Sequence, residues 1–245
     1  MDSKYFSDYA RAFRKSIDIL KAFGLCRLPV DIFKIIDRFP RLKLETYTNL
    51  AAKNNCELSE IISMFESDLG VCVYDEVFGN AIIYYNDTLN NYGLIRFTVT
   101  HEFGHYVLGH FDYIDEKIIK IHGGNDNLYK IFEREANCFA RNLLCPSALV
   151  ELFGIADSHH IASIFKISNK AAKVRLDMHK KYDRTYLNEH ILNDFNKKFS
   201  YYIEKYQKKK PDTYISNLER AVWYARLDAE FARAEDEYLG LVRSR

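Results

Sequence analysis

The 245-residue chain lacks three features that would place it in a common class of protein. It has no apolar run long enough to cross a bilayer, and no apolar segment of a signal peptide follows Met1. Its 35 basic residues are balanced by 34 acidic ones, so the basic excess of a nucleic-acid-binding protein is missing. We therefore expect no membrane partner and no direct nucleic-acid partner.

Cysteine is scarce, and its spacing fits no familiar framework. The five cysteines are odd in number and form no C-x-x-C pair, which argues against a disulfide scaffold. They are Cys26, Cys56, Cys72, Cys138 and Cys145. We expect a cytoplasmic protein with reduced thiols. Cys138 and Cys145 lie on the outward side of a predicted helix and are interpreted as structural.

The most informative segment that is present is His101-Glu102-Phe103-Gly104-His105, which matches H-E-x-x-H, the helical motif of zinc peptidases. One helical turn separates the two histidines, so both imidazoles project from one face and can bind the same metal. Glu102 lies beside that metal, where it can take a proton from a bound water. The motif therefore predicts two ligands and a base.

The residues around this motif predict a buried helix over 93–110. On a helical wheel the histidines share a face with apolar side chains, and the opposite face is apolar as well. The first face carries Leu94, Phe97 and Leu108; the second carries Ile95, Val99, Phe103 and Tyr106. Polar groups buried in such a helix need partners. A pair of hydrogen-bonded core histidines is the alternative interpretation, but it gives no reason for Glu102.

A catalytic zinc ion needs a third protein ligand. The longer motif H-E-x-x-H-x-x-G-x-x-H does not supply one, because Leu108 and Phe111 occupy its Gly and His positions. His110 is out of register by one residue, and Gly109 predicts the end of the helix. His110 and His122 are candidate oxyanion stabilisers, although each is more readily interpreted as a surface histidine.

A better candidate for the third ligand lies in segment 129–146, YKIFEREANCFARNLLCP, which predicts a helix closed by Pro146. Its core stripe is formed by Phe132, Ala136, Phe139 and Leu143. Glu133 borders this stripe, whereas Glu135 falls on the far side and should face water. The wheel favours Glu133 as a ligand, with an ion pair to Arg134 or a lysine as the alternative. Asn137, one turn on, could hydrogen-bond a ligand histidine or Glu133.

Two segments resemble the ImmA/IrrE family of metallopeptidases: RFTVTHEFGHYVLGH over 96–110 and EREANCFARNLLCP over 133–146. That family carries an R-F-T-x-x-H-E-x-G-H block and then an E-x-x-A-N/D-x-F-A-x-x-L-L-M-P block, from which Cys145 is the visible departure. Looser similarity extends over residues 10–180. The resemblance implies a gluzincin-like site in which His101, His105 and Glu133 hold Zn2+ and Glu102 is the catalytic base.

The resemblance also implies a biological role. Members of the family often sit beside a helix-turn-helix repressor on phages and integrative elements, and cleave that repressor. We therefore expect a zinc-dependent endopeptidase with a helix-turn-helix transcriptional repressor as its protein substrate. The alternative is a non-catalytic regulatory protein that binds such a repressor through the same fold. The intact Glu102 argues against it, because a pure binder has no need of a base.

The predicted fold class is α+β, with a mainly helical zincin-like metallopeptidase domain and a small three-stranded sheet. Strands are predicted over 42–47, 71–74 and 81–85, the last two as a hairpin. An edge of this hairpin could pair with extended substrate, or the sheet could merely cover the helix. Residues 161–165 and 168–180 are interpreted as a helix pair packed on this domain rather than a DNA-binding motif, given the neutral charge.

We place the metallopeptidase domain over residues 1–180 and a charged helical C-terminal extension over 181–245. Within the extension, Ser216 and Glu219 predict a capping box that opens a helix with two apolar stripes. The stripes are Leu218, Val222, Ala225, Ala229 and Ala232, and Leu227, Phe231, Ala234, Tyr238 and Leu241. A helix over 216–243 could dock on the domain, hold a partner or form a dimer, and the sequence leaves these open.

Overall fold

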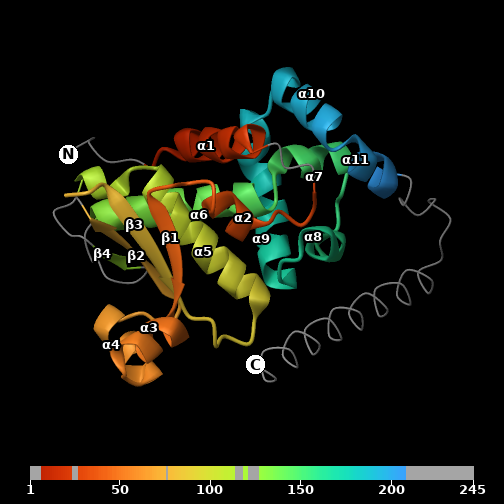
Figure 1. The fold of residues 1–245 in the computed structure, drawn as a ribbon. Helices are drawn as coiled ribbons and strands as arrows, with labels where there is room; N and C mark the ends of the chain where they lie inside the picture. Colours follow the sequence, from red (N-terminus) through yellow and green to blue (C-terminus); the bar gives the residue numbers. More distant parts are fainter. Residues whose placement is uncertain (1–6, 24–26, 76, 114–117, 121–126, 208–245) are drawn as a thin grey trace. The chain divides into compact units, whose positions relative to one another are not determined.

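The computed structural model describes residues 7–23, 27–75, 77–113, 118–120 and 127–207 (Figure 1). These residues fall into two compact units. The first is built from the described parts of Met1–Leu25, Val30–Leu89 and Leu94–Pro146, and the second from those of Cys26–Pro29, Asn90–Gly93 and Ser147–Arg245. No helix among the described residues is long and apolar enough to cross a membrane.

A mixed sheet organises the first unit (Figure 1). Strand β1 (Leu42–Thr46) runs parallel to β3 (Asn80–Tyr85), which pairs antiparallel with β2 (Gly70–Asp75). The short strand β4 (Ile118–Lys120) adds to the far side of β2, giving the order β1-β3-β2-β4. The predicted strands and hairpin are present with one further strand, and the mainly helical α+β class is confirmed.

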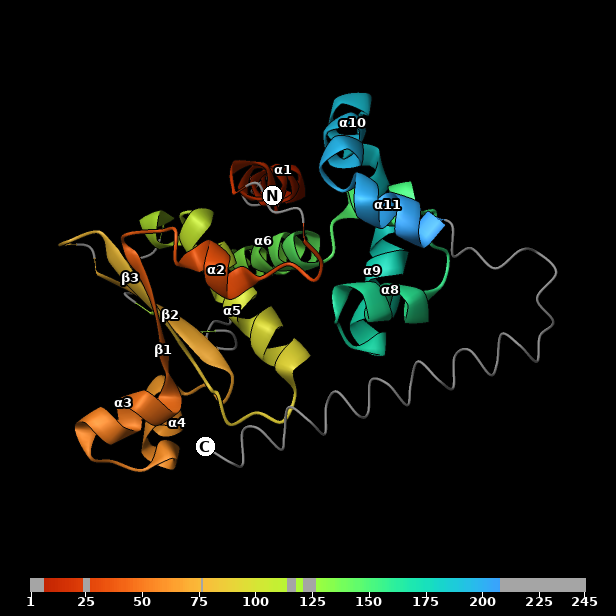
Figure 2. The same ribbon diagram turned by 45° about the vertical axis from the view of Figure 1, so that its right-hand side comes forward.

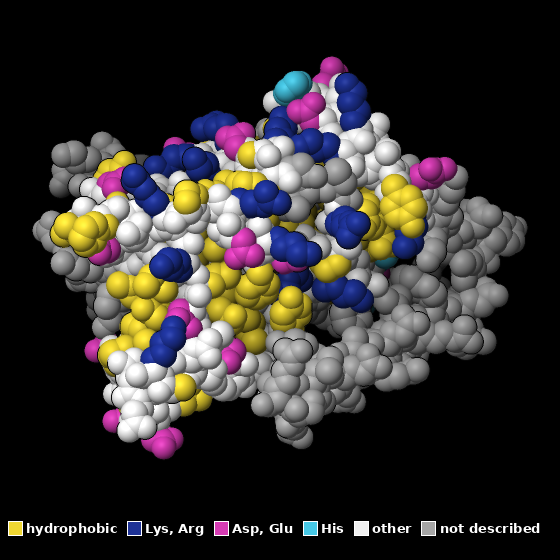
Figure 3. Space-filling model, viewed as in Figure 1, with side chains coloured by type: hydrophobic (Ala, Val, Ile, Leu, Met, Phe, Trp, Pro, Cys, Tyr) yellow, Lys and Arg dark blue, Asp and Glu magenta, His cyan; other side chains and the backbone are white. Residues whose placement is uncertain are grey.

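The two faces of the sheet differ in burial. Along β3, Ala81 and Ile83 are buried, whereas Ile82 and Tyr84, which alternate with them, are partly exposed. This period of two shows that one face is covered and the other is in partial contact with solvent. Figure 3 shows hydrophobic side chains gathered over this part of the first unit, with basic and acidic side chains both scattered around them.

Helix α5 (Tyr92–Val107) lies against the covered face of the sheet (Figure 2). The approach is closest at Gly70, where an added Cβ would lie 2.7 Å from Thr98 Cγ2 on α5 and 2.9 Å from the Tyr84 carbonyl oxygen. Glycine therefore suits the start of β2, because a side chain there would have to displace the Thr98 side chain and the Tyr84 carbonyl group.

The burial of α5 confirms the prediction from its wheel, since ten of its residues between Ile95 and His105 are buried. The aromatic ring of Phe103 packs edge-on against Phe39 and Phe139, with centroid distances of 5.0 Å and 5.7 Å. Gly109 has a φ of 65°, a left-handed conformation that glycine adopts without strain, and it follows the end of the helix as predicted.

Helix α6 (Asn127–Leu144) packs against α5 and α1 (Tyr9–Ala22). A Cβ added to Gly104 on α5 would lie 3.3 Å from the Cα of Ala136 on α6, so the two backbones almost touch there. The apolar face of α1 is buried, and Asp8 caps its N-terminus by accepting a hydrogen bond from the Arg11 amide. As predicted, α6 ends just before Pro146.

The remaining helices of the first unit are short. Helix α2 (Ile32–Ile36) starts at the N-cap Asp31. Helices α3 (Tyr47–Asn54) and α4 (Leu58–Phe65) sit at one end of the sheet in both views (Figures 1 and 2). They share a small apolar cluster with β2: Tyr47, Ala51, Ile61, Phe65 and Val71. A 3-10 turn over His110–Tyr113 follows α5.

The second unit is helical throughout its described residues. It contains α7 (Ser147–Phe153), α8 (Ser158–Phe165), α9 (Asn169–Lys181), a 3-10 turn (Asp183–Tyr186), α10 (Glu189–Lys198) and α11 (Ser200–Gln207). Helices α8 and α9 pack together as the predicted pair, and α10 and α11 pack on α7. The domain boundary at residue 180 stays a prediction, and the helix predicted over 216–243 lies outside the described residues.

We expect Gly70→Ala to lower the free energy of unfolding by about 1–3 kcal/mol, because the new methyl group must displace both the Thr98 side chain and the Tyr84 carbonyl group. Urea unfolding of the purified protein measures this change. Lys43→Ala, on an exposed position of β1, is the control and should stay within about 0.5 kcal/mol of wild type. Wild-type stability in Gly70→Ala would contradict the close approach of α5 to the sheet.

Candidate metal centre

Helices α5 and α6 bring His101, His105 and Glu133 together. The Nε2 atoms of the two histidines lie 3.0 Å apart. Glu133 places Oε2 at 3.3 Å from His101 Nε2 and Oε1 at 3.3 Å from His105 Nε2. Within the part of the chain that the structure describes, this is the group of three side chains whose donor atoms converge closely enough to hold a metal ion.

The spacing of these donor atoms fits a single ion. Atoms that bind one tetrahedral metal ion at about 2.0–2.1 Å lie roughly 3.3 Å from one another, and the three measured separations are 3.0, 3.3 and 3.3 Å. Glu133 Oε1 also has no hydrogen bond of ordinary geometry within the described residues. Its 3.3 Å contact with His105 Nε2 is therefore one of proximity, as expected for two ligands of one ion.

The ionisation of these groups largely suits metal binding. Burial lowers the pKa of His105 to about 3, so its ring is neutral and its nitrogen lone pair is available. Burial opposes ionisation of Glu133, but the nearby His101 and His105 rings hold the pKa of its carboxyl well below the usual value. In contrast, Glu133 and Glu102 raise the pKa of His101 despite its burial, so a metal competes with a proton at that ring.

Glu102 is fully buried one residue after the first histidine. Neither of its carboxylate oxygens has a hydrogen-bond partner of ordinary geometry among the described residues. Burial, reinforced by the charge of Glu133 and opposed by His101 and the Cys72 backbone amide, raises the pKa of Glu102 to about 8. A buried carboxyl group whose oxygens lack hydrogen bonds of ordinary geometry costs stability, so packing alone gives no reason for Glu102 at this position.

Asn137 lies beside the first ligand candidate. Its Oδ1 atom is 3.2 Å from Nδ1 of His101, so that nitrogen can donate its hydrogen while Nε2 faces Glu133. Of the two contacts that the sequence left open for Asn137, the structure shows the one to a histidine. Its orienting role stays a prediction.

Comparison with known protein families matches residues 63–177 to the IrrE N-terminal-like domain of peptidase family M78. These residues belong to the ImmA/IrrE peptidase family. The matched segment contains all of α5 and α6, and therefore all three candidate ligands and Glu102. It assigns a metal-using, peptidase-type domain to this part of the chain. A comparison with curated proteins gives no match.

Several side chains of this domain were wrongly predicted to point outward, and the first is Glu135, which does not face water. It is 4% exposed and accepts hydrogen bonds from the Asp8 amide at 2.6 Å and from the Arg11 guanidinium at 3.0 Å. The wheel of α6 assigned this side to solvent because its apolar stripe lies elsewhere, but α1 covers it. Cys138, buried against the Tyr9 carbonyl, and Cys145, which is also buried, were wrongly placed outward.

His110 was likewise expected at the surface and is fully buried. Its ring stacks on Phe132, with a centroid distance of 4.3 Å and an interplanar angle of 12°. Its Nδ1 atom lies 2.9 Å from Nδ1 of His105. Helical periodicity could not place His110, because Gly109 ends the helical path. The only feature of the sequence that pointed to a place for His110 near the metal centre was its position five residues after the candidate ligand His105. His122 lies outside the described residues.

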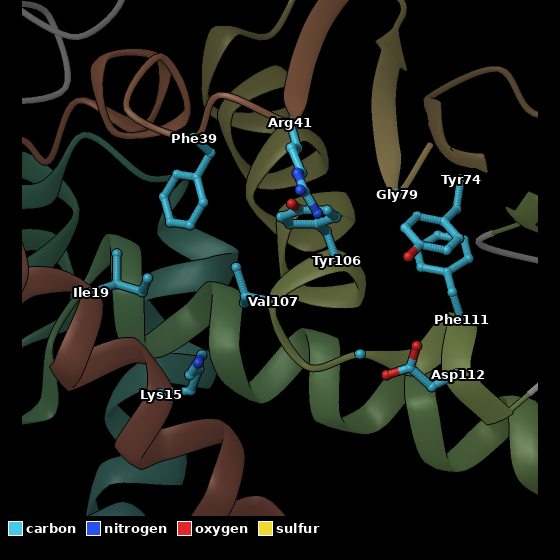
Figure 4. A pocket seen from close by; sticks show the side chains of 11 residues that line it. Lys15, Ile19, Phe39, Arg41, Tyr74, Gly79, Tyr106, Val107, Phe111 and Asp112 are labelled. Carbon is cyan, nitrogen blue, oxygen red and sulfur yellow. The ribbon is translucent and has the colours of Figure 1, made fainter. Parts of the chain in front are cut away.

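A pocket of about 390 Å³ opens at the C-terminal end of α5 (Figure 4). Aromatic rings from four segments line it, together with Lys15, Arg41 and Asp112. The four aromatic residues are Phe39, Tyr74, Tyr106 and Phe111. The three candidate ligands are not part of its lining. The lining side chains of this pocket do not form a metal-ligand set, so His101, His105 and Glu133 stay the candidate metal centre.

We expect Glu133→Gln to weaken binding of a divalent metal by about 100-fold or more, because a neutral amide replaces the one negatively charged ligand of a three-ligand site. Competition with a coloured chelator measures the affinity. Glu189→Gln, an exposed glutamate in the first turn of α10, is the matched control and should bind like wild type. Unchanged affinity in Glu133→Gln would remove Glu133 from the ligand set.

Proposed function

We propose that this chain is a zinc-dependent endopeptidase. His101, His105 and Glu133 would hold the zinc ion, Glu102 would act as the catalytic base, and Asn137 would orient His101. Two imidazoles with one carboxylate form a ligand set of catalytic zinc sites, which leave a further position open. The observation that carries the proposal is the buried carboxyl group of Glu102, which has no hydrogen bond of ordinary geometry within the described part of the chain, next to three converging donor atoms.

A zinc ion in this site would polarise the scissile carbonyl and lower the pKa of a coordinated water toward neutrality. Glu102 accepts a proton from the water as its oxygen bonds to the peptide carbon. It then gives that proton to the leaving nitrogen as the C–N bond breaks, so one water is consumed and one acid and one amine are formed. The charge of a bound zinc ion would oppose the burial that raises the pKa of Glu102 to about 8, and would so favour the ionised form that accepts the proton.

The proposed substrate is a helix-turn-helix transcriptional repressor encoded on a phage or integrative element. Its support is the resemblance of the two sequence blocks around His101 and Glu133 to the ImmA/IrrE family, together with the family match over 63–177. A repressor of this kind works in the cytoplasm, so the proposal carries a cytoplasmic location with it.

The non-catalytic alternative is disfavoured by the environment of Glu102. A protein that only binds a repressor gains nothing from a fully buried carboxyl group whose oxygens have no hydrogen bond of ordinary geometry among the described residues, and it loses stability by keeping that group. Replacement of such a group by an apolar residue would strengthen the core of α5. A base beside a ligand set gives the carboxylate a reason to be there.

We expect Glu102→Gln to keep its zinc and to lower the rate of peptide cleavage by about 10²- to 10⁴-fold, because glutamine cannot accept the proton of the attacking water. A library of internally quenched fluorescent peptides measures cleavage, and elemental analysis measures zinc. Glu189→Gln is again the matched control.

Two results would contradict the assignment. Glu102→Gln that cleaves peptides at the wild-type rate with zinc bound would remove Glu102 as the base. Wild-type protein with a full complement of zinc that binds a repressor tightly and leaves it intact would favour the non-catalytic alternative.

A further inference from the structure

We propose that His110 and Glu135 form a relay that positions the ligand histidine His105. This inference rests on the proposed metal site, but it assigns a role to two side chains that contribute no ligand to it. His105, His110 and Glu135 follow one another in a line of contacts that begins at the ligand set and ends at the N-terminus of α1. All three are buried.

The contacts of the relay are short and continuous. His105 Nδ1 lies 2.9 Å from His110 Nδ1, and His110 Nε2 lies 3.2 Å from Glu135 Oε2. The Nε2 atom of His105 is on the other side of its ring, 3.0 Å from His101 Nε2 and 3.3 Å from Glu133 Oε1. The ring of His105 thus faces the candidate metal site with one nitrogen and the relay with the other.

Only one arrangement of hydrogens satisfies this line with neutral rings. The Glu135 carboxylate is an acceptor, so His110 must donate from Nε2. The Nδ1 atom of His110 is then an acceptor, and it receives the hydrogen on Nδ1 of His105. This leaves the lone pair of His105 on Nε2, where a metal would bind. The relay therefore selects the tautomer of His105 that is competent for metal binding.

Neighbouring groups hold the relay in place. Glu135 accepts the Asp8 amide hydrogen at 2.6 Å and pairs with Arg11 at 3.0 Å, so the first turn of α1 fixes its carboxylate. The face of His110 stacks on Phe132, which restricts rotation of the ring. Stacking and hydrogen bonds together leave His110 little freedom to turn away from His105.

The position of Glu135 on α6 explains why a second histidine is needed. Glu135 follows Glu133 by two residues, which corresponds to a rotation of about 200° around the helix axis. Glu135 therefore points away from Glu133 and from the ligand set. Asn137, by contrast, reaches His101 directly from the same helix. His110 spans the gap between Glu135 and His105. Helix α6 would thus supply one ligand, Glu133, and two orienting side chains. Asn137 contacts His101 directly, and Glu135 acts on His105 through His110.

Two substitutions at His110 separate hydrogen bonding from packing. His110→Phe keeps an aromatic ring stacked on Phe132 but offers no acceptor to His105. His110→Asn loses the ring but can place its amide oxygen close to where Nδ1 was. We expect His110→Phe to bind Zn2+ about 10- to 100-fold more weakly than wild type, and His110→Asn to regain most of that affinity. Chelator competition measures the dissociation constants.

Three controls accompany this comparison. His190→Phe replaces a histidine whose side chain is 80% exposed and should bind Zn2+ like wild type. Thermal unfolding of the metal-free variants shows whether each is folded. Should His110→Phe fail to fold, Glu135→Met breaks the line one step further from the metal and should weaken zinc binding in the same direction. The visible spectrum of the Co2+-loaded protein should shift in His110→Phe, because His105 is then free to reorient.

The outcomes separate this proposal from the proposed function. Wild-type zinc affinity in folded His110→Phe, or equal losses in the Phe and Asn variants, would overturn the relay. Peptide cleavage by the wild type would still support the peptidase. Weaker zinc binding in His110→Phe with rescue in His110→Asn supports the relay even if no peptide is cleaved, in which case the peptidase proposal fails alone. A wild type that binds no Zn2+ would overturn both.

Discussion

The close approach of α5 and α6 is the contact on which the metal centre depends. The backbones of the two helices come closest where Gly104 on α5 faces Ala136 on α6, because neither residue has a side chain large enough to hold the helices apart. The next residue on α5 is His105, and Glu133 lies one turn before Ala136 on α6. A carboxylate side chain is short, so Glu133 can reach both histidines only while the helices stay this close.

Much of this site follows from local periodicity. The spacing of His101 and His105 and the stripe that brings Glu133 inward are properties of single helices, so the sequence was enough to predict which side chains meet. The hairpin of β2 and β3 was likewise predicted from alternation. The three-residue strand β4 was not, because three residues carry no periodic signal.

The misplaced residues share a different cause. Glu135 and Cys138 were placed outward because a wheel gives the faces of one helix but not the neighbour that covers each face. That neighbour is α1, whose contacts with α6 are separated by more than a hundred residues along the chain. His110 follows the break at Gly109, beyond the reach of any helical pattern. Long-range packing, and not a wrong motif, limited the prediction.

The anchoring of Glu135 by Asp8 and Arg11 also bears on where the functional unit begins. The segment shared with the ImmA/IrrE family, residues 63–177, carries every candidate ligand. It does not carry the first turn of α1, which supplies the two donors that hold Glu135. The family segment therefore contains all the candidate ligands, but it lacks part of the hydrogen-bond network around them. A fragment cut to the family boundary would keep the ligands, but it would lose both the donors that hold Glu135 and the helix that covers it.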